Sequence, residues 1–510
     1  MKEKDTDLIS LLEKALSQQP QEYPDEIGTV IKVGDGICKV FGLNNANLGE
    51  VIEFENGGRG IILDMDEDFV SVILFEGAKL VFEQDVAKRT GKVLSIPVGN
   101  GLLGRVISAT GTPLDLLGDI KAEKWMPLEQ PCTGIIDRTP INESLETGIT
   151  VIDSMFPIGK GQRELFIGDR GTGKTALVID AILNQVGKNV ICIYVSIGHK
   201  QSDTARLIYL LEKHGALEYT VIVEADAKES PLNQYLAPYA GCSIGEYFMR
   251  QGKDALIVYD DLSKHAIAYR ELALLLKRPP GREAYPGDIF YIHSRLLERA
   301  CKMSDQLGGG SLTAFPIIQT QEDDISGYIP TNLISITDGQ VILDTSLFNS
   351  GIKPAVNVGL SVSRVGRAAQ TKAMRSVSGS LKLELAQYYE LLAFVQFGSE
   401  LDKTSQKAID RGQRAIEILK QPEHETYSFV DQVLFLFLLK ENYLNKLNLT
   451  DVKKFVLQFA SYVHGAHGET YNNILNTKEI TPNDLTRLKK AADEFGIIFS
   501  SKTNVLKDTK

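Results

Sequence analysis

A chain of 510 residues is too long for a single hydrophobic core, so we expect about three domains. Its formal charge of −11, with an ordinary 43% share of hydrophobic residues, argues against a general nucleic-acid binder. No apolar run reaches the roughly 20 residues that a membrane-spanning helix needs. The five cysteines have neither disulfide nor metal-ligand spacing, which predicts reduced thiols and no zinc site.

The first predicted element is a short amphipathic helix over residues 7–18. An isolated helix of this length is only marginally stable in water, so its apolar face must pack against something. Two interpretations stay open: the helix packs on its own domain, or it docks on another subunit. Its apolar face carries Leu8, Leu11, Leu12 and Ala15.

Residues 23–92 alternate short apolar stretches with Gly, Asn and Asp. Turn signals at this frequency predict a small β-barrel. The segment lacks the dense basic and aromatic face of a barrel that binds oligonucleotides. We therefore expect a structural role for this segment and no nucleic acid among the partners. The apolar stretches are residues 28–33, 37–40, 50–54, 60–63 and 70–74.

Beyond the barrel the pattern becomes α/β, and residues 168–176 carry a phosphate-binding loop. The pattern G-x-x-x-x-G-K-T stands between a predicted strand at 164–167 and a predicted helix at 176–186. Glycines let backbone N–H groups approach phosphate oxygens. Lys174 would reach the terminal phosphates, and the Thr175 hydroxyl would ligate Mg²⁺. The expected phosphate cradle consists of Gly168, Asp169, Arg170, Gly171, Thr172, Gly173, Lys174, Thr175 and Ala176.

A second part of the predicted nucleotide site is Asp260, which directly follows an apolar strand at 255–259. Nucleotide-binding folds hold the Mg²⁺ shell with an Asp at the carboxyl end of such a strand. This signal is weak alone and gains weight downstream of a phosphate loop. We assign the role to Asp260 and keep Asp261 as the alternate.

The rest of the chain gives coarser predictions. Three prolines in residues 275–288 indicate a stiff, non-helical loop. A helix is predicted over 289–304 and a strand over 338–343. Arg364 and Arg367 are expected at the surface because Gly and Ser surround them. The final part of the chain reads as a series of helices.

Several strings together are more specific than the phosphate loop alone. They are VGDGICKVFGL at 33–43, QRELFIGDRGTGKT at 162–175, YDDLSKHAIAYRELALLLKRPPGREAYPGD at 259–288 and VGLSVSRVGRAAQ at 358–370. With these strings the chain resembles the alpha subunit of the rotary F-type ATP synthase. The resemblance begins at about residue 7 and continues into the C-terminal region.

The resemblance implies a fold class: an α/β P-loop (RecA-like) nucleotide-binding core with an N-terminal β-barrel and a C-terminal α-helical domain. The implied domains are a docking helix at 1–22, a barrel at 23–92, a nucleotide-binding domain at 93–370 and a helical domain at 371–510.

The resemblance also implies cofactors, partners and a location. Three alpha and three beta chains would alternate around a gamma shaft on the cytoplasmic face of the cell membrane, with membrane contact only through partner subunits. Residues 7–18 would dock the delta subunit of the peripheral stalk. The alpha chain would hold Mg²⁺ with ATP or ADP at a regulatory site that turns over little. Arg364 matches the family's arginine finger, which reaches the γ-phosphate at the beta site.

The residues expected around the adenine depart from the family. Lys353 replaces an Arg before Pro354, and Glu423 with the residue after it replaces a Gln-Tyr pair. We therefore expect weaker or less base-selective nucleotide binding. The expected adenine contacts are Phe348, Lys353, Pro354, Gln421 and Glu423.

Three further departures affect the chemistry. Gly171 replaces a Gln in the phosphate loop, and Arg367 replaces a small residue. His199 stands where beta subunits carry a Glu and most alpha subunits a Gln. Hydrolysis needs a carboxylate to orient the attacking water, so we expect a largely non-catalytic site. Two alternatives stay open: a diverged paralogue in a rotary motor not used for ATP synthesis, and, more remotely, a hexameric RNA-translocating helicase.

Overall fold

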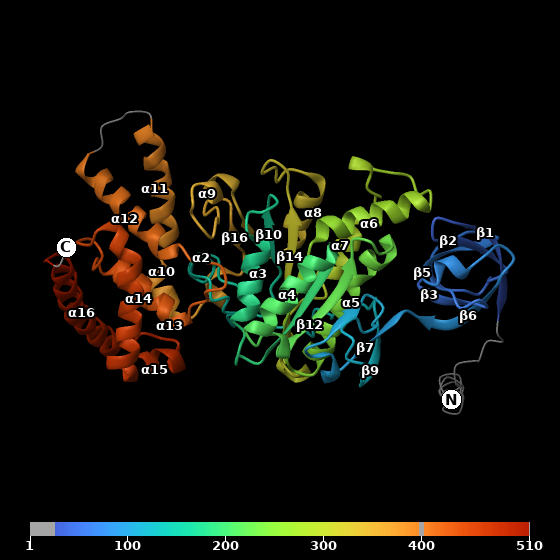
Figure 1. Ribbon diagram of the computed structural model, residues 1–510, viewed down its shortest axis with the longest axis horizontal. Coiled ribbons are helices and arrows are strands. Elements are labelled where there is room, and N and C mark those ends of the chain that lie inside the picture. Colours follow the sequence, from blue (N-terminus) through green and yellow to red (C-terminus); the bar gives the residue numbers. More distant parts are fainter. Residues whose placement is uncertain (1–25, 397–401, 509–510) are drawn as a thin grey trace, which may run out of the picture. The chain divides into compact units, whose positions relative to one another are not determined.

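The structure, a computed structural model, describes residues 26–396 and 402–508. The predicted docking helix at 7–18 lies outside these residues. The chain forms two compact units (Figure 1). The first runs to Leu94 and also takes in residues 275–277, and the second holds the remainder.

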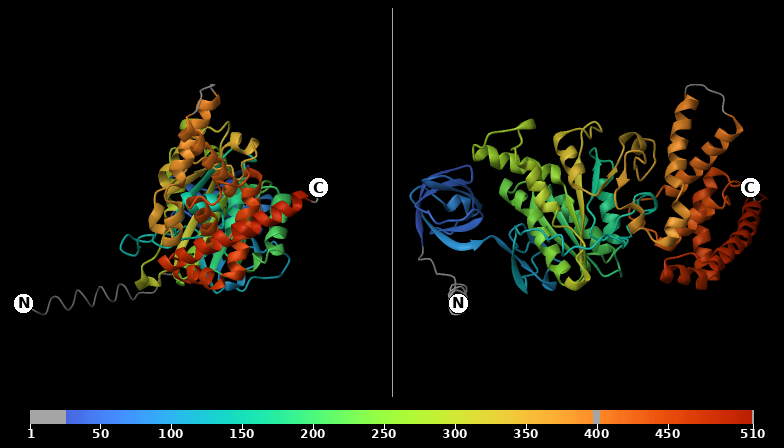
Figure 2. Two further views of the ribbon diagram at one scale, coloured as in Figure 1. Left: turned by 90° about the vertical axis from the view of Figure 1, so that its left-hand side faces the viewer. Right: turned by 180° about the vertical axis from the view of Figure 1, so that it is seen from behind.

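The first unit is a closed barrel with the strand order β1-β2-β5-β4-β3-β6, drawn in blue in Figures 1 and 2. Alternate side chains point inward, and Val40, Ile52 and Val72 are fully buried. The predicted barrel is confirmed. Its strands are β1 (Ile27–Gly34), β2 (Ile37–Phe41), β3 (Glu50–Phe54), β4 (Arg59–Met65), β5 (Phe69–Glu76) and β6 (Val86–Val93).

The centre of the second unit is an eight-stranded sheet with the order β16-β15-β10-β14-β13-β11-β12-β8 within the described residues. Its pairs are parallel except β15–β16. Continuous apolar runs such as 190–195 suit strands buried on both faces. The strands are β8 (Val106–Ser108), β10 (Glu164–Gly168), β11 (Val190–His199), β12 (Thr220–Asp226), β13 (Asp254–Asp260), β14 (Ser311–Gln319), β15 (Gly339–Ile342) and β16 (Val362–Ser363). A separate pair joins β7 (Ser95–Val98) to β9 (Lys124–Pro127).

The strand register fixes the position of the functional side chains. Gly168 at the end of β10 pairs with Gln319 on β14, and Asp260 at the end of β13 pairs with Ser196 on β11. The carboxyl ends of β10, β14, β13 and β11 therefore meet at one edge of the sheet. In open α/β sheets this edge is where ligands bind.

Helices cover both faces of this sheet. Gly241 of α5 lies against Val195 and Ile193, whereas Tyr194 shares a buried cluster with Leu177 of α3. Because side chains alternate along β11, α5 and α3 are on opposite faces. The helices are α2 (Thr150–Met155), α3 (Lys174–Leu183), α4 (Gln201–Lys213), α5 (Pro231–Arg250), α6 (Leu262–Leu275), α7 (Ile289–Leu297), α8 (Tyr328–Ile336) and α9 (Thr345–Asn349).

The helix predicted over 289–304 was too long, because α7 ends at Leu297. The next residues serve other contacts. Arg299 is buried, and its guanidinium binds the Glu246 carboxylate at 2.8 and 3.0 Å. The carbonyl of Cys301 accepts a hydrogen bond from the N–H of Leu312 on β14. Pairing of the residues around Cys301 with β14 therefore takes the place of the last predicted helical turns.

The C-terminal part is helical, as predicted. Helix α13 is buried almost along its whole length and packs against α10, α12, α14 and α15 (Figure 1). Among the described residues, no helix is both long and apolar enough to cross a bilayer. The helices are α10 (Lys372–Ser378), α11 (Leu381–Gln396), α12 (Lys403–Leu419), α13 (Phe429–Lys440), α14 (Leu449–Ala466), α15 (Gly468–Thr477) and α16 (Pro482–Asp508).

Candidate functional site

The phosphate-loop sequence forms a tight turn between β10, which ends at Gly168, and α3, which begins at Lys174. Gly173 has φ +98°, a left-handed conformation that favours glycine. The Thr172 hydroxyl donates to the carbonyl of Asp169 at 2.9 Å and closes the turn. The N-terminus of α3 therefore faces the carboxyl edge of the sheet, where its unpaired N–H groups suit an anion.

Lys174 is buried inside this turn. Its Nζ donates to the carbonyls of Gly168 and Asp169, at 2.6 Å each. Burial lowers the pKa of Lys174, and the negative charges of Asp261, Asp260 and Asp169 oppose that change only in part. Two backbone carbonyls therefore hold the Lys174 ammonium at the loop, and the nearby carboxylates compensate its charge only in part.

Asp260 lies beside Thr175. The Thr175 hydroxyl donates to Oδ2 of Asp260 at 3.0 Å, and the Tyr194 hydroxyl donates to the same oxygen. Burial raises the pKa of Asp260, but His199, Tyr194 and Thr175 outweigh it, so this pKa lies below its usual value. Asp261 takes a different partner, the backbone N–H of Lys264 at 2.8 Å. Thr175 and Asp260, the two residues predicted to ligate Mg²⁺, are therefore neighbours in the fold.

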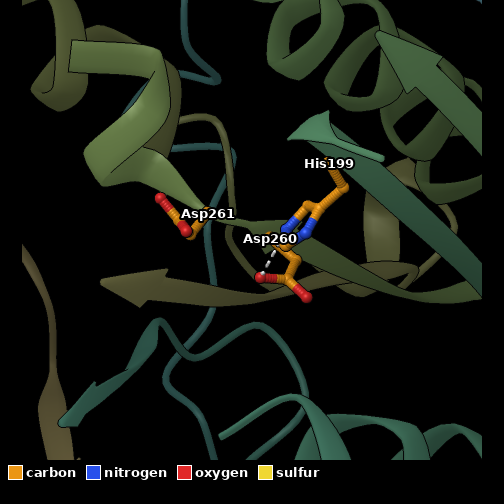
Figure 3. Close-up of side chains that lie close together, drawn as sticks. All are labelled: His199, Asp260 and Asp261. Atoms are coloured by element: carbon orange, nitrogen blue, oxygen red, sulfur yellow. Dashed lines mark ion pairs between the residues drawn. The ribbon is translucent and has the colours of Figure 1, made fainter. Parts of the chain in front are cut away.

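His199 is the last residue of β11, and its ring lies next to the Asp260 carboxylate (Figure 3). Nε2 is 3.2 Å from Oδ1 of Asp260, yet the ring is not aligned for a hydrogen bond. Within the described residues this buried nitrogen has no hydrogen-bond partner. Burial opposes a charge on the ring, but the Asp260 carboxylate outweighs it, and the pKa of His199 is raised.

A cavity of about 730 Å³ joins these residues. Its walls come from the phosphate loop, from the ends of β11 and β13, from α4, and from the turn that contains Glu423. This is large enough for a nucleotide-sized ligand. Predicted site residues on its wall are Arg170, Gly171, Lys174, Thr175, Ala176, Asp260 and Glu423.

The residues predicted to contact adenine lie together in a second, smaller cavity beside the phosphate loop. Nζ of Lys353 lies 4.1 Å from the centre of the Phe348 ring, which it covers with a cation–π contact. The Gln421 amide is fully engaged: Nε2 donates to the carbonyls of Gly148 and Glu425, and Oε1 accepts from the N–H of Thr150. The cavity wall includes Thr172, Gly173, Ala176, Phe348, Lys353, Pro354, Gln421 and Glu423.

Sequence reasoning missed two residues that shape the site. Asp180 on α3 is buried and accepts hydrogen bonds from His424, which ties the turn containing Glu423 to the phosphate-loop helix. Tyr194 donates to Asp260 from the neighbouring strand. Neither residue belongs to a motif, so only the folded structure reveals them.

Arg364 lines neither of these two cavities. Its backbone N–H donates to the carbonyl of Asp338 at 2.7 Å, and its guanidinium reaches the carbonyl of Ile334 at 3.2 Å. The side chain is exposed, as the sequence predicted. Glu164 is fully buried and accepts from the amide of Gln162 at 2.7 Å; burial raises its pKa, and the charge of Arg364 opposes that change.

Three segments match known families. Residues 25–91 match the "ATP synthase alpha/beta family, beta-barrel domain", residues 148–363 the "ATP synthase alpha/beta family, nucleotide-binding domain", and residues 370–495 the "ATP synthase alpha/beta chain, C terminal domain".

Relatives that match nearly the whole chain belong to the same family. ATP synthase subunit alpha of Acetivibrio thermocellus is 55% identical, over 93% of this chain and 94% of the relative. The subunit alpha of Caldanaerobacter subterraneus subsp. tengcongensis is 53% identical over 94% of each chain. That of Clostridium botulinum (strain Alaska E43 / Type E3) is 52% identical over 97% and 99%. These matches support neither the diverged paralogue nor the helicase.

Proposed function

The chain belongs to the family of ATP synthase alpha subunits, and on that premise we propose that it performs two tasks within the complex. It holds Mg²⁺ with ATP or ADP at a regulatory site of low turnover. It also lends Arg364 to the catalytic site of an adjacent beta subunit. The observation that carries this proposal is the separation of the two: Lys174, Thr175 and Asp260 share one cavity, and Arg364 is exposed outside it.

The nucleotide site rests on the chemistry of the residues around the 730 Å³ cavity. Thr175 and Asp260 offer the oxygen ligands that Mg²⁺ requires. When bound, this ion neutralises charge on the β- and γ-phosphates. Lys174 adds a second positive charge, and the α3 N-terminus contributes backbone N–H groups.

The proposed low turnover follows from His199, which ends β11 and lines the cavity. An attacking water needs a base that is correctly placed and free to accept a proton. Asp260 already accepts from Thr175 and Tyr194, and His199 offers an imidazole beside it instead of a separate carboxylate. Nucleotide therefore stays bound and stabilises the assembly by mass action.

The task of Arg364 is performed on a neighbouring chain. An arginine finger stabilises negative charge on the transferring phosphoryl group and is worth about 10³–10⁵ in rate. The backbone bond from Arg364 to Asp338 anchors the residue while its side chain stays exposed. The assembly proposed is an alternating ring of three alpha and three beta chains around a gamma shaft. Residues 7–18 dock the delta subunit, and partner subunits place the complex on the cytoplasmic face of the membrane.

The first experiment uses the purified full chain without its partners. We expect it to bind Mg²⁺-ATP at one site per chain, to release almost no phosphate, and to lose binding in Lys174→Ala. Lys446→Ala, on the helical part of the chain, is the matched control and retains binding. Sustained ATP turnover by the isolated chain contradicts the proposal.

A further inference from the structure

We propose that His199, Asp260 and Asp261 form a site for a divalent transition cation, of the Mn²⁺ or Co²⁺ type, that fills without nucleotide. The proposal deepens the proposed function, because the site opens into the same cavity. It differs from a Mg²⁺ site in two respects: a ring nitrogen is a direct ligand, and the protein supplies three ligands before any phosphate arrives.

The first support is geometry. One ligand atom from each of the three residues lies within 4.8 Å of the other two, at the carboxyl edge of the sheet (Figure 3). Ligands bound to one cation at about 2.0–2.3 Å are separated by no more than about 4.5 Å. Small side-chain rotations therefore bring all three atoms onto one ion.

The second support is that, within the described residues, each of the three side chains has one ligand atom without a hydrogen bond. Nε2 of His199 is buried and has no hydrogen-bond partner within the described residues. Oδ2 of Asp260 accepts from two hydroxyl groups, which leaves Oδ1 turned toward His199. Oδ1 of Asp261 accepts the backbone N–H of Lys264, and its other oxygen is 4.0 Å from the Lys264 ammonium. Nε2 of His199 and Oδ1 of Asp260 face each other across 3.2 Å, so both can bind a cation that takes the place of the proton between them.

The third support is charge. Asp260 and Asp261 are adjacent in sequence and almost fully buried, at 3% and 5% exposure. Two neighbouring carboxylates are costly to bury unless positive charge compensates them. Lys264 is at the limit of ion-pair distance, and the Lys174 ammonium is directed to the carbonyls of the phosphate loop. When the His199 ring is protonated it compensates one of these carboxylates, and a bound divalent cation that replaces this proton compensates both.

The imidazole nitrogen of His199 decides which kind of cation fits the site. Mg²⁺ prefers an octahedron of oxygen ligands and keeps several waters, whereas imidazole favours first-row transition metals. One imidazole with two carboxylates, open on the cavity side, suits a six-coordinate Mn²⁺ or Co²⁺ ion that also binds water.

Mn²⁺ is the probe, because its electron spin reports directly bound nitrogen. The full chain, stripped of nucleotide, is titrated with Mn²⁺ and followed by electron paramagnetic resonance. We expect one bound ion per chain with ¹⁴N hyperfine coupling, and coupling to ¹⁵N when the histidines are ¹⁵N-labelled. In His199→Gln the coupling disappears and affinity falls at least about tenfold, since even outer partners of a metal ligand are worth that much. His464→Gln, an exposed histidine in α14, is the matched control.

Three outcomes overturn the proposal: no Mn²⁺ bound without nucleotide, bound Mn²⁺ without nitrogen coupling, or a coupling that persists in His199→Gln. The labelling experiment uses the unaltered chain, so a folding defect in the variant leaves it valid. Mg²⁺-ATP binding measured on the same sample separates the two proposals. ATP binding without Mn²⁺ binding refutes the cation site alone, and absent ATP binding refutes the proposed function.

Discussion

Asp180 accepts two hydrogen bonds from His424 through one oxygen, Oδ1: from the backbone N–H at 3.0 Å and from ring atom Nδ1 at 3.1 Å. The pair joins α3 to the turn that contains Glu423. Glu423 lines both cavities, His424 lines the larger one and Asp180 the smaller one, so this contact positions part of the wall of each cavity.

The pair gives a pH-dependent stability. Burial raises the pKa of Asp180 to about 6, although His424 opposes the change. A carboxyl group with a higher pKa in the folded than in the unfolded chain favours the folded state as it takes up its proton. As pH falls from about 6 to about 4, we expect the wild type to gain up to about 3 kcal/mol of stability relative to Asp180→Asn.

Thermal midpoints of both proteins, recorded across this pH range, test the prediction. Above about pH 7 the carboxyl group is ionised in both states, so the difference between the two proteins becomes constant. Asp119→Asn, at an exposed position, is the matched control and shows no such trend. A difference that stays flat from pH 4 to pH 7 refutes the prediction.

Thr175 offers a second prediction with a built-in control. Thr175→Val keeps the shape of the side chain and removes the hydroxyl that bonds Asp260, whereas Thr175→Ser keeps the hydroxyl. We expect the gain in ATP affinity that Mg²⁺ provides to fall about tenfold to a hundredfold in the Val variant, the range for a hydrogen bond to a charged group. Calorimetric titration with and without Mg²⁺ measures it. Equal losses in both variants mean that the hydroxyl plays no part.

Base selectivity is the third prediction. Glu423 places a carboxylate at the wall of the smaller cavity, where it repels phosphates and donates no hydrogen bond to a base. Glu423→Gln should therefore increase ATP affinity about fivefold, equivalent to one net hydrogen bond. The matched control, Glu425→Gln, alters an exposed side chain outside both cavities. ATP and GTP titrations of the wild type should differ less than about tenfold, and strong preference for ATP contradicts our interpretation.

The fourth prediction concerns packing in the helical part. A Cβ atom added to Gly412 of α12 would lie 2.5 Å from the Tyr388 ring on α11, whereas one added to Gly465 of α14 meets no atom within 4 Å. We expect Gly412→Ala to destabilise the chain by about 1–3 kcal/mol. Gly465→Ala should be neutral or stabilising by up to about 1 kcal/mol. Denaturant unfolding compares them, and equal midpoints refute the packing argument.

The sequence allowed the phosphate loop, the Asp260 strand and the barrel to be predicted, because each has a local pattern. Turn glycines mark the loop, an apolar run ending in Asp marks the strand, and alternation with frequent turns marks the barrel. The residues expected to contact adenine were chosen by family resemblance, and in the structure they line one cavity.

The remaining features depend on which strands and helices become neighbours. His199 was recognised as a departure, but its contact with Asp260 follows from the pairing of β11 with β13. The Asp180–His424 contact spans 244 positions. The predicted helix over 289–304 was too long for the same reason, since strand pairing at Cys301 outweighs local helical preference beyond Leu297.

The most direct test of the central claim replaces Arg364 with Ala in the assembled complex of alpha, beta and gamma chains. Arg367→Ala, three residues away and also exposed, is the matched control. We expect Arg364→Ala to lower the rate of ATP hydrolysis about 10³-fold or more, while the alpha site binds Mg²⁺-ATP as before. If an assembled Arg364→Ala complex hydrolyses ATP at the wild-type rate, the chain does not lend this guanidinium to its neighbour.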